Sequence, residues 1–211
     1  GLTANITKAD LVVSGITASN RVYDTTVTAV LGGTAAVSPL SNDVVTIGGT
    51  AAGTFADKNV GNGKAITITG VTISGTDADN YNLVQQTGLT ANVTAKSITI
   101  TGTTASNKVY DADVAATLVT TSSAITNGAT SSSDNKYYTA DTVSLVKTGA
   151  AATFANKNVA DGKAVTVTGF SLSGADADNY ALVQPTGLTA NITKADLVVS
   201  GITASNRVYD T

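Results

Sequence analysis

Apolar and polar residues alternate along most of the chain, which is the pattern of β-strands with one buried face. In the stretch 65–74, Ile66 and Ile68 share one parity, whereas Val71 and Ile73 share the other. A strand places alternate side chains on the same face. No stretch of helical length shows an apolar period of about 3.6 residues. The pattern therefore predicts an all-β protein made of short strands.

The parity of the apolar positions changes at glycines. Such changes fall at Gly15, Gly70 and Gly169. A glycine inside a strand is typical of a β-bulge, or of a bend where the strand leaves one sheet for another. We therefore expect a bulge or a change of sheet at each of these three residues.

A long internal repeat organises the chain. The pentapeptide GLTAN begins at Gly1, Gly88 and Gly187, and the tripeptide VYD ends at Asp24, Asp111 and Asp210. This period of about 90 residues exceeds the 20–50 residues of solenoid repeats and fits a small β domain. We predict two tandem elongated β-sandwich modules, immunoglobulin-like or alternatively β-grasp-like, each with about seven strands.

Parity also predicts the limits of these modules. The apolar positions keep one parity from Tyr81 to Val93, which predicts one long continuous strand joining the modules end to end. The predicted segments are the terminal strand of a truncated preceding repeat (1–7), module 1 (8–94), module 2 with an enlarged loop at 120–138 (95–193), and the start of a truncated following repeat (194–211). We expect the two end segments to be frayed or to pair with neighbouring molecules.

The composition excludes several kinds of chemistry. The chain has no Cys, His, Met or Trp, and all 15 acidic residues are Asp. Imidazole and thiolate catalysis are therefore unavailable, and we expect no enzymatic activity. A formal net charge of −3 provides no basic face for nucleic acid. No run of about 18 apolar residues is present, so we expect no membrane insertion by this segment.

Four motifs in a fixed order resemble the YDG and MBG repeats of large secreted bacterial adhesins. They read ITKADLVVSG, NRVYDT, FADKNVGNGKAITITG and SGTDADNYNL. The resemblance covers essentially the whole chain. It implies a structural stalk or spacer repeat of a filamentous-haemagglutinin-like, two-partner-secreted cell-surface protein. Such a repeat would be extracellular and would form a stiff rod that projects a binding region for cell adhesion or biofilm formation.

The resemblance also implies partners, and the sequence departs from the family's motif at one position. Neighbouring repeats of the same chain are the implied partners. The third position of the YDG motif, usually glycine, is Thr25, Ala112 and Thr211 here. Glycine tolerates a positive φ and threonine does not, so we expect the turn to differ in backbone geometry.

A second interpretation is a repeated weak binding module for host or matrix glycans or proteins, acting by avidity. The pairs Tyr23–Asp24 and Tyr110–Asp111 set an aromatic face beside a carboxylate, as sugar sites do. Alternatively, the tyrosine packs at a module junction and the aspartate shapes the following turn. The loop 120–138 is a further candidate, although only the second copy contains it.

The motif TDADNY and its second copy ADADNY suggest a calcium site. Ca²⁺ takes six to eight oxygen ligands, and the candidate ligands are Asp77, Asp79, Asn80, Asp176, Asp178 and Asn179. The alternative is a turn whose side chains cap backbone N–H groups. Calcium is the single cofactor that the sequence suggests. Lys8, Lys58 and Lys157, each close to Asn or Asp in sequence, are candidates for an isopeptide bond.

Overall fold

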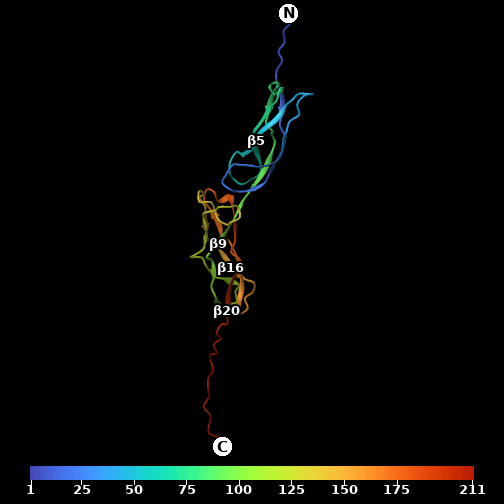
Figure 1. Ribbon diagram of the computed structural model, residues 1–211. Coiled ribbons are helices and arrows are strands. Elements are labelled where there is room, and N and C mark those ends of the chain that lie inside the picture. Colours follow the sequence, from blue (N-terminus) through green and yellow to red (C-terminus); the bar gives the residue numbers. More distant parts are fainter. The chain divides into compact units, whose positions relative to one another are not determined.

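The computed structural model describes all 211 residues and consists almost entirely of strands and loops (Figure 1). The strands of the first copy are β1 (Ala9–Val12), β2 (Ser14–Ser19), β3 (Arg21–Val22), β4 (Val30–Ala36), β5 (Thr46–Phe55), β6 (Gly61–Ser74), β7 (Tyr81–Val84) and β8 (Thr90–Thr94). A 3₁₀ turn, η1 (Ala78–Asn80), precedes β7.

The second copy has shorter and more numerous strands. They are β9 (Lys96–Thr101), β10 (Thr104–Ala105), β11 (Lys108–Val109), β12 (Ala115–Ala116), β13 (Leu118–Val119), β14 (Ala124–Ile125), β15 (Ser144–Val146), β16 (Ala151–Phe154), β17 (Ala160–Thr168), β18 (Ser171–Ser173), β19 (Tyr180–Val183) and β20 (Leu188–Thr193). The turn η2 (Ala177–Asn179) precedes β19. The prediction of an all-β protein with tandem modules is confirmed, and no helix is long and apolar enough to cross a membrane.

The sheets mix parallel and antiparallel pairs. In the first copy, the order β3-β8-β6-β5 forms the main sheet, in which only β3 and β8 are parallel. Strand β1 pairs in parallel with β7, and β2 pairs antiparallel with β4. The second copy repeats both parallel pairs, as β9–β19 and β11–β20. Immunoglobulin sheets are antiparallel, whereas here the opening strands of each copy run alongside its closing strands, in the same direction.

The glycines at the parity changes behave as predicted. Gly70 has φ +86°, and a Cβ added to it would lie 2.3 Å from the carbonyl oxygen of Thr50. The β5–β6 register shifts opposite Gly70. Strand β1 pairs with β7, while β2, which contains Gly15, pairs with β4. Gly169, with φ +85°, separates β17 from β18. A side chain at these positions would collide with a carbonyl oxygen of the neighbouring segment, so glycine is required.

The predicted continuous strand over 81–93 is wrong. It divides into β7 and β8, which belong to different sheets. Between them, the side-chain amide of Gln85 donates to the carbonyl of Val71 at 2.8 Å, and Gly88 has a φ of +80°. The second copy repeats the break between β19 and β20. The connection keeps the same parity on both sides, so the alternation of apolar residues does not reveal the break.

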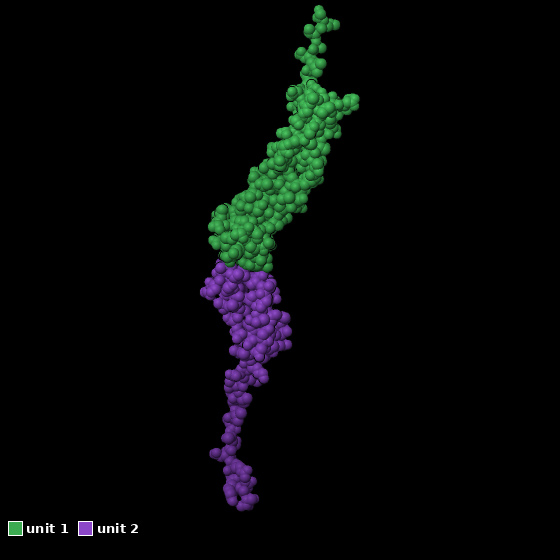
Figure 2. Space-filling model, viewed as in Figure 1, with its two compact units in different colours: residues 1–99, 125–145, 172–183 green, residues 100–124, 146–171, 184–211 purple.

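The chain divides into two compact units whose limits differ from those of the sequence repeats (Figure 2). Unit 1 contains residues 1–99, 125–145 and 172–183, and unit 2 contains residues 100–124, 146–171 and 184–211. Unit 1 therefore combines the first copy with two stretches of the second. Its core is one cluster comprising Val13, Ile16, Tyr23, Ala29, Phe55, Ile66, Ile68, Val71, Ala91, Val93, Ile98, Val143 and Tyr180.

Unit 2 has a smaller core on the sheet β11-β20-β17-β16-β12. Its buried apolar side chains are Ile100, Ala152, Phe154, Val165, Val167, Phe170, Ala190 and Ile192. Residues 1–8 and 194–211 belong to no strand and are exposed.

The enlarged loop at 120–138 has internal structure rather than being only an exposed insertion. Asp134 accepts hydrogen bonds from the backbone N–H groups of Thr130, Ser131 and Lys136. Its carboxylate also pairs at 2.8 Å with Lys96, whose side chain is completely buried. This ion pair holds the pKa of Asp134 well below its ordinary value. The loop is thereby fastened to the start of β9.

Candidate functional site

The tyrosine of the first VYD motif lies in the core of unit 1 at the junction between the two copies. Tyr23 follows β3 directly, and its N–H donates to the carbonyl of Thr94 at 2.9 Å. Its side chain has no exposed surface. The hydroxyl donates to a carboxylate oxygen of Asp141, in the second copy, at 2.8 Å. A residue of one repeat is thus completely buried against the next.

Asp141 is the centre of this junction. Its carboxylate, with no exposed surface, accepts hydrogen bonds from the hydroxyls of Tyr23 and Tyr180, at 2.8 and 2.6 Å. It also accepts one from Nζ of Lys58, at 2.7 Å. Lys58 reaches a second carboxylate, that of Asp176, at 3.0 Å. A buried carboxylate is tolerated only when it is paired and hydrogen-bonded, and Asp141 meets both conditions with partners from the two copies.

The charges at the junction change the proton affinities of its members. The hydrogen bond to Asp141 raises the pKa of Lys58 above its ordinary value. Burial and the same carboxylate raise the pKa of the Tyr180 hydroxyl. The junction therefore favours the ammonium form of Lys58. The Lys58–Asp141 contact is an ion pair.

Aromatic rings contact one another beside the buried carboxylate. The ring of Tyr23 meets those of Tyr180 and Tyr138 edge to face, with centroids 5.6 and 6.1 Å apart. Tyr137 meets Tyr180 in the same way, at 6.5 Å. The ammonium of Lys58 lies 5.7 Å from the centroid of Tyr23. Edge-to-face pairs and cation–π contacts each add to the stabilisation from burial alone. Tyr137 and Tyr138 come from the end of the enlarged loop.

An amide completes the contact between the copies. Oδ1 of Asn179, in η2, accepts the N–H of Val60 at 2.9 Å, and its Nδ2 donates to Oδ1 of Asn59 at 3.2 Å. Asn179 is buried. The motif KNV of the first copy, which contains Lys58, Asn59 and Val60, thus contacts the motif ADADNY of the second.

The predicted calcium ligands lie in and beside the two 3₁₀ turns. Asp77 and Asp176 precede the turns η1 and η2 and accept the backbone N–H groups of Val44 and Thr142 at 2.7 and 3.0 Å. Asp79, Asp178, Asn80 and Asn179 lie within those turns. No group of three or more acidic side chains is close enough to hold a metal ion. The carboxylates of Asp77 and Asp176 thus bind backbone N–H groups outside the turns. A Ca²⁺ titration of the melting temperature tests the calcium prediction directly.

The predicted ligand-binding pairs separate into different roles. Tyr23 has no face open to a ligand, and Asp24 accepts hydrogen bonds from the N–H and the hydroxyl of Thr26, as expected of a residue that shapes a turn. Asp111 pairs with Lys108 at 2.7 Å and accepts the N–H of Asp113. Tyr110 is half-buried. The first pair is therefore part of the junction, whereas the ring of Tyr110 keeps an exposed surface.

Asp141 and Lys58 were not predicted as partners from the sequence. Asp141 lies just beyond the enlarged loop and outside every repeated motif. The sequence nevertheless contained a signal for this contact, because the motif VYD, the motif KNV and the tyrosine turn motif around ADNY occur in both copies. These three motifs meet at the junction.

The fold and the junction define a class of protein, namely a tandem β-repeat protein whose copies bind one another through buried polar side chains. The family model of the YDG domain matches residues 7–88 and 94–187, and the chain belongs to this family. No curated protein and no solved structure shows significant similarity to the chain.

The third position of the YDG motif keeps a glycine-like backbone. Thr25 has a φ of +70° and Ala112 a φ of +67°. Threonine and alanine thus adopt at this position a positive φ that was expected of glycine alone. The hydrogen bonds of Asp24 and Asp111 to the backbone after the turn hold the left-handed conformation, at a cost in strain for residues with a Cβ.

Replacing Thr25 by glycine is therefore expected to stabilise the protein by about 1 kcal/mol, the approximate cost of a left-handed conformation for a residue with a side chain. Urea unfolding followed by circular dichroism measures the change. Ala112→Gly should act in the same direction. A loss of stability in both variants would contradict the strain at this position.

Alkaline pH is expected to destabilise unit 1. Burial, together with the carboxylate of Asp141, raises the pKa of Tyr23 from 10.0 to about 12. Because the folded state holds this proton more tightly than the unfolded state, its contribution to stability is complete below pH 10 and is lost as the pH rises toward 12. The free energy of unfolding measured across this range should fall less steeply in Tyr23→Phe. An unchanged slope in this variant would contradict the assignment, and Tyr209→Phe, in the exposed end segment, serves as the control.

Proposed function

We propose that the chain is a structural spacer repeat in the stalk of a secreted bacterial surface adhesin. The observation that supports this proposal is the complete burial of Tyr23 against Asp141, Tyr180 and Lys58. The aromatic residue of the family's motif thus serves the contact between neighbouring repeats. A spacer requires such contacts and needs no pocket for a substrate.

The polar character of the junction suits this function. A purely apolar contact tolerates sliding, whereas a buried carboxylate that accepts three hydrogen bonds is satisfied in one arrangement only. Asn179 adds a further directional contact to the backbone of Val60. A stalk of such repeats would resist bending at its junctions and would hold a distal binding region for adhesion or biofilm formation away from the cell surface.

The composition is consistent with an extracellular, non-catalytic role. The chain lacks Cys and His, so it contains no thiol to oxidise and no imidazole that changes charge near neutral pH. No nucleophile and general base of the usual kinds can be paired. We place neighbouring repeats first among its partners and assign it no role in nucleic-acid binding.

The test measures how the length of an array depends on the number of repeats. Arrays of increasing repeat number, examined by small-angle X-ray scattering, should lengthen in proportion to that number. Flexibly linked domains would lengthen only with its square root. Alanine at the position of Tyr23 in every copy is expected to shift the dependence toward the flexible case. If the length of the unaltered arrays increased only with the square root of the repeat number, the proposal of a stiff stalk would be overturned.

The alternative is a weak binding module that acts through the number of its copies. The exposed tip of the enlarged loop, residues 130–133, is its best remaining candidate. We expect no binding of the 211-residue chain to a glycan array or to immobilised matrix proteins. Binding that is lost when residues 130–133 are replaced by a glycine–serine linker would favour the alternative.

A further inference from the structure

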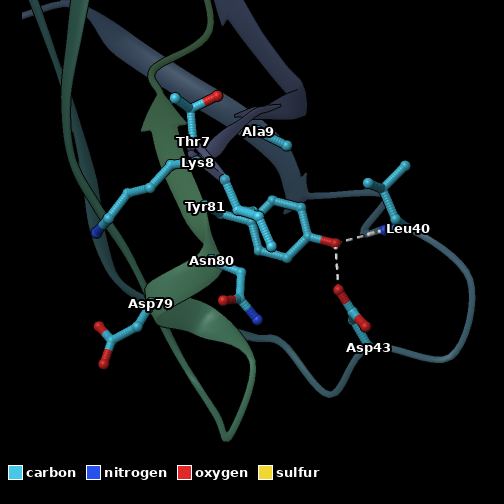
Figure 3. A pocket seen from close by; sticks show the side chains of 9 residues that line it. Thr7, Lys8, Ala9, Leu40, Asp43, Asp79, Asn80 and Tyr81 are labelled. Carbon is cyan, nitrogen blue, oxygen red and sulfur yellow. Dashed lines mark hydrogen bonds between the residues drawn. The ribbon is translucent and has the colours of Figure 1, made fainter. Parts of the chain in front are cut away.

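The first copy contains the same set of polar side chains that receives Tyr23 in the second copy. The hydroxyl of Tyr81 donates to Asp43 at 2.6 Å and accepts the N–H of Leu40 at 2.7 Å (Figure 3). In the second copy, Tyr180 does the same with Asp141, at 2.6 Å, and with the N–H of Tyr138, at 2.9 Å. We call each set a socket: the first socket consists of Asp43, Tyr81, Leu40, Asp77 and Asn80, and the second of Asp141, Tyr180, Tyr138, Asp176 and Asn179.

The two sockets differ in what fills them. The second socket holds Tyr23 and Lys58, whereas the first opens into a pocket of about 430 Å³. Within that pocket, Asp43 accepts a side-chain hydrogen bond only from Tyr81. Asn80 is exposed and makes no side-chain hydrogen bond, whereas its equivalent Asn179 is buried and makes two. The first socket therefore offers the same groups without a partner.

The residues that fill the second socket also recur, in unit 2. We call each such set a plug: the first plug consists of Tyr23, Lys58, Asn59 and Val60, and the second of Tyr110, Lys157, Asn158 and Val159. The backbone presents them alike, since the N–H groups of Tyr23 and Tyr110 each donate at 2.9 Å to the last residue of the adjacent closing strand, Thr94 or Thr193.

The second plug is open. Tyr110, Asn158 and Val159 line a pocket of about 410 Å³ together with Lys194 and Ala195. Val159 is 42% exposed, and Lys157 is exposed and forms no ion pair. The molecule thus presents an unfilled socket in one unit and an unused plug in the other.

We propose that the second plug of one molecule binds the first socket of another copy of the chain. The hydroxyl of Tyr110 donates to Asp43, which retains lone pairs for it, and the ammonium of Lys157 lies between the carboxylates of Asp43 and Asp77. Asn80 receives the backbone N–H of Val159, as Asn179 receives that of Val60. Leu40, which is 62% exposed, replaces Tyr138 as the surface that covers the incoming ring.

The charges and the symmetry of the contact agree with this assignment. The carboxylates of Asp43 and Asp77 in the socket and the ammonium of Lys157 in the plug match Asp141, Asp176 and Lys58 of the filled junction. Lys8 and Asp79 also line the socket pocket, and Lys194 lines the plug pocket. Because plug and socket are different surfaces, the contact is head to tail and leaves one of each free for further molecules. The inference goes beyond the proposed function, since a chain that stays monomeric would leave the stalk proposal intact.

The test is the concentration dependence of the molecular mass of the 211-residue chain, measured by sedimentation velocity. The unaltered chain should associate progressively. Tyr110→Phe, which removes one hydrogen bond, should weaken association by about tenfold. Asp43→Asn should prevent it more completely, because its amide turns N–H groups toward Lys157 while its carbonyl still accepts from Tyr81. Tyr209→Phe, in the exposed end segment, should associate like the unaltered chain.

A mixing experiment separates plug from socket. Tyr110→Ala retains an intact socket and Asp43→Asn an intact plug, so each variant alone should remain monomeric. Their mixture should form dimers and nothing larger, since one plug and one socket remain. Melting curves establish that both variants are folded. A monomeric unaltered chain, variants that associate as well as that chain, or a mixture that stays monomeric would each overturn the proposal.

Discussion

Replacing Tyr23 by alanine is expected to lower the free energy of unfolding by about 3–5 kcal/mol, the range for truncating a large buried aromatic side chain. The ring of Tyr23 is completely buried and contacts Tyr138 and Tyr180. Its removal also leaves the carboxylate of Asp141 with one hydrogen-bond donor fewer. Urea unfolding followed by far-ultraviolet circular dichroism measures the loss. Tyr23→Phe, which keeps the ring, should cost only about 1 kcal/mol.

The equivalent residue of the second copy provides the control. Tyr110 follows β11 as Tyr23 follows β3, but it is only half-buried and lines an open pocket. Tyr110→Ala is therefore expected to cost no more than about 1 kcal/mol. Equal losses for the two tyrosines would mean that the contribution of Tyr23 comes from its own copy alone and that the junction adds nothing.

Replacing Asp141 by alanine is expected to destabilise the protein by about 3 kcal/mol, since breaking a buried ion pair leaves uncompensated polar groups behind. Two tyrosine hydroxyls lose their acceptor, and Lys58 keeps only Asp176. The partial exposure of Lys58 places the value at the low end of the usual range. Thermal melting and urea unfolding of the same variant measure it.

Asp43 is the matched position in the first copy. Its carboxylate accepts only the hydroxyl of Tyr81 among side chains, so Asp43→Ala is expected to cost about 1 kcal/mol. If Asp43→Ala and Asp141→Ala had the same effect, the contacts from Tyr23 and Lys58 would be energetically unimportant.

The alternation of apolar residues identified the strands and their bends, because both are local properties of the backbone. Gly15, Gly70 and Gly169 were identified from parity alone, since a strand cannot change its buried face without a bulge or a bend. The same reasoning failed between β7 and β8. There Gln85 and Gly88 break the strand over a connection that preserves parity.

The junction could be predicted only in part. Packing of Tyr23 against a neighbouring module was one of two interpretations of the VYD motif, and the sequence did not decide between them. Asp141 is 118 positions away from Tyr23, in the segment that differs most between the copies. Its pairing with Lys58 depends on how two copies meet, which no pattern within one copy specifies. The left-handed φ of Thr25 was not predicted either. The hydrogen bonds that Asp24 accepts override the preference of threonine for a negative φ.

At the junction, the first copy contributes a tyrosine and a lysine, and the second copy an aspartate, a second tyrosine and an asparagine. In an array whose junctions all repeat this contact, an unequal recombination that adds or removes a whole copy would join a complete plug to a complete socket, and the array would change its length in a single genetic event without a defective junction. Point substitutions have the opposite consequence. A change of Tyr23 damages the environment of Asp141 in the next copy, so adjacent copies cannot diverge independently at these positions.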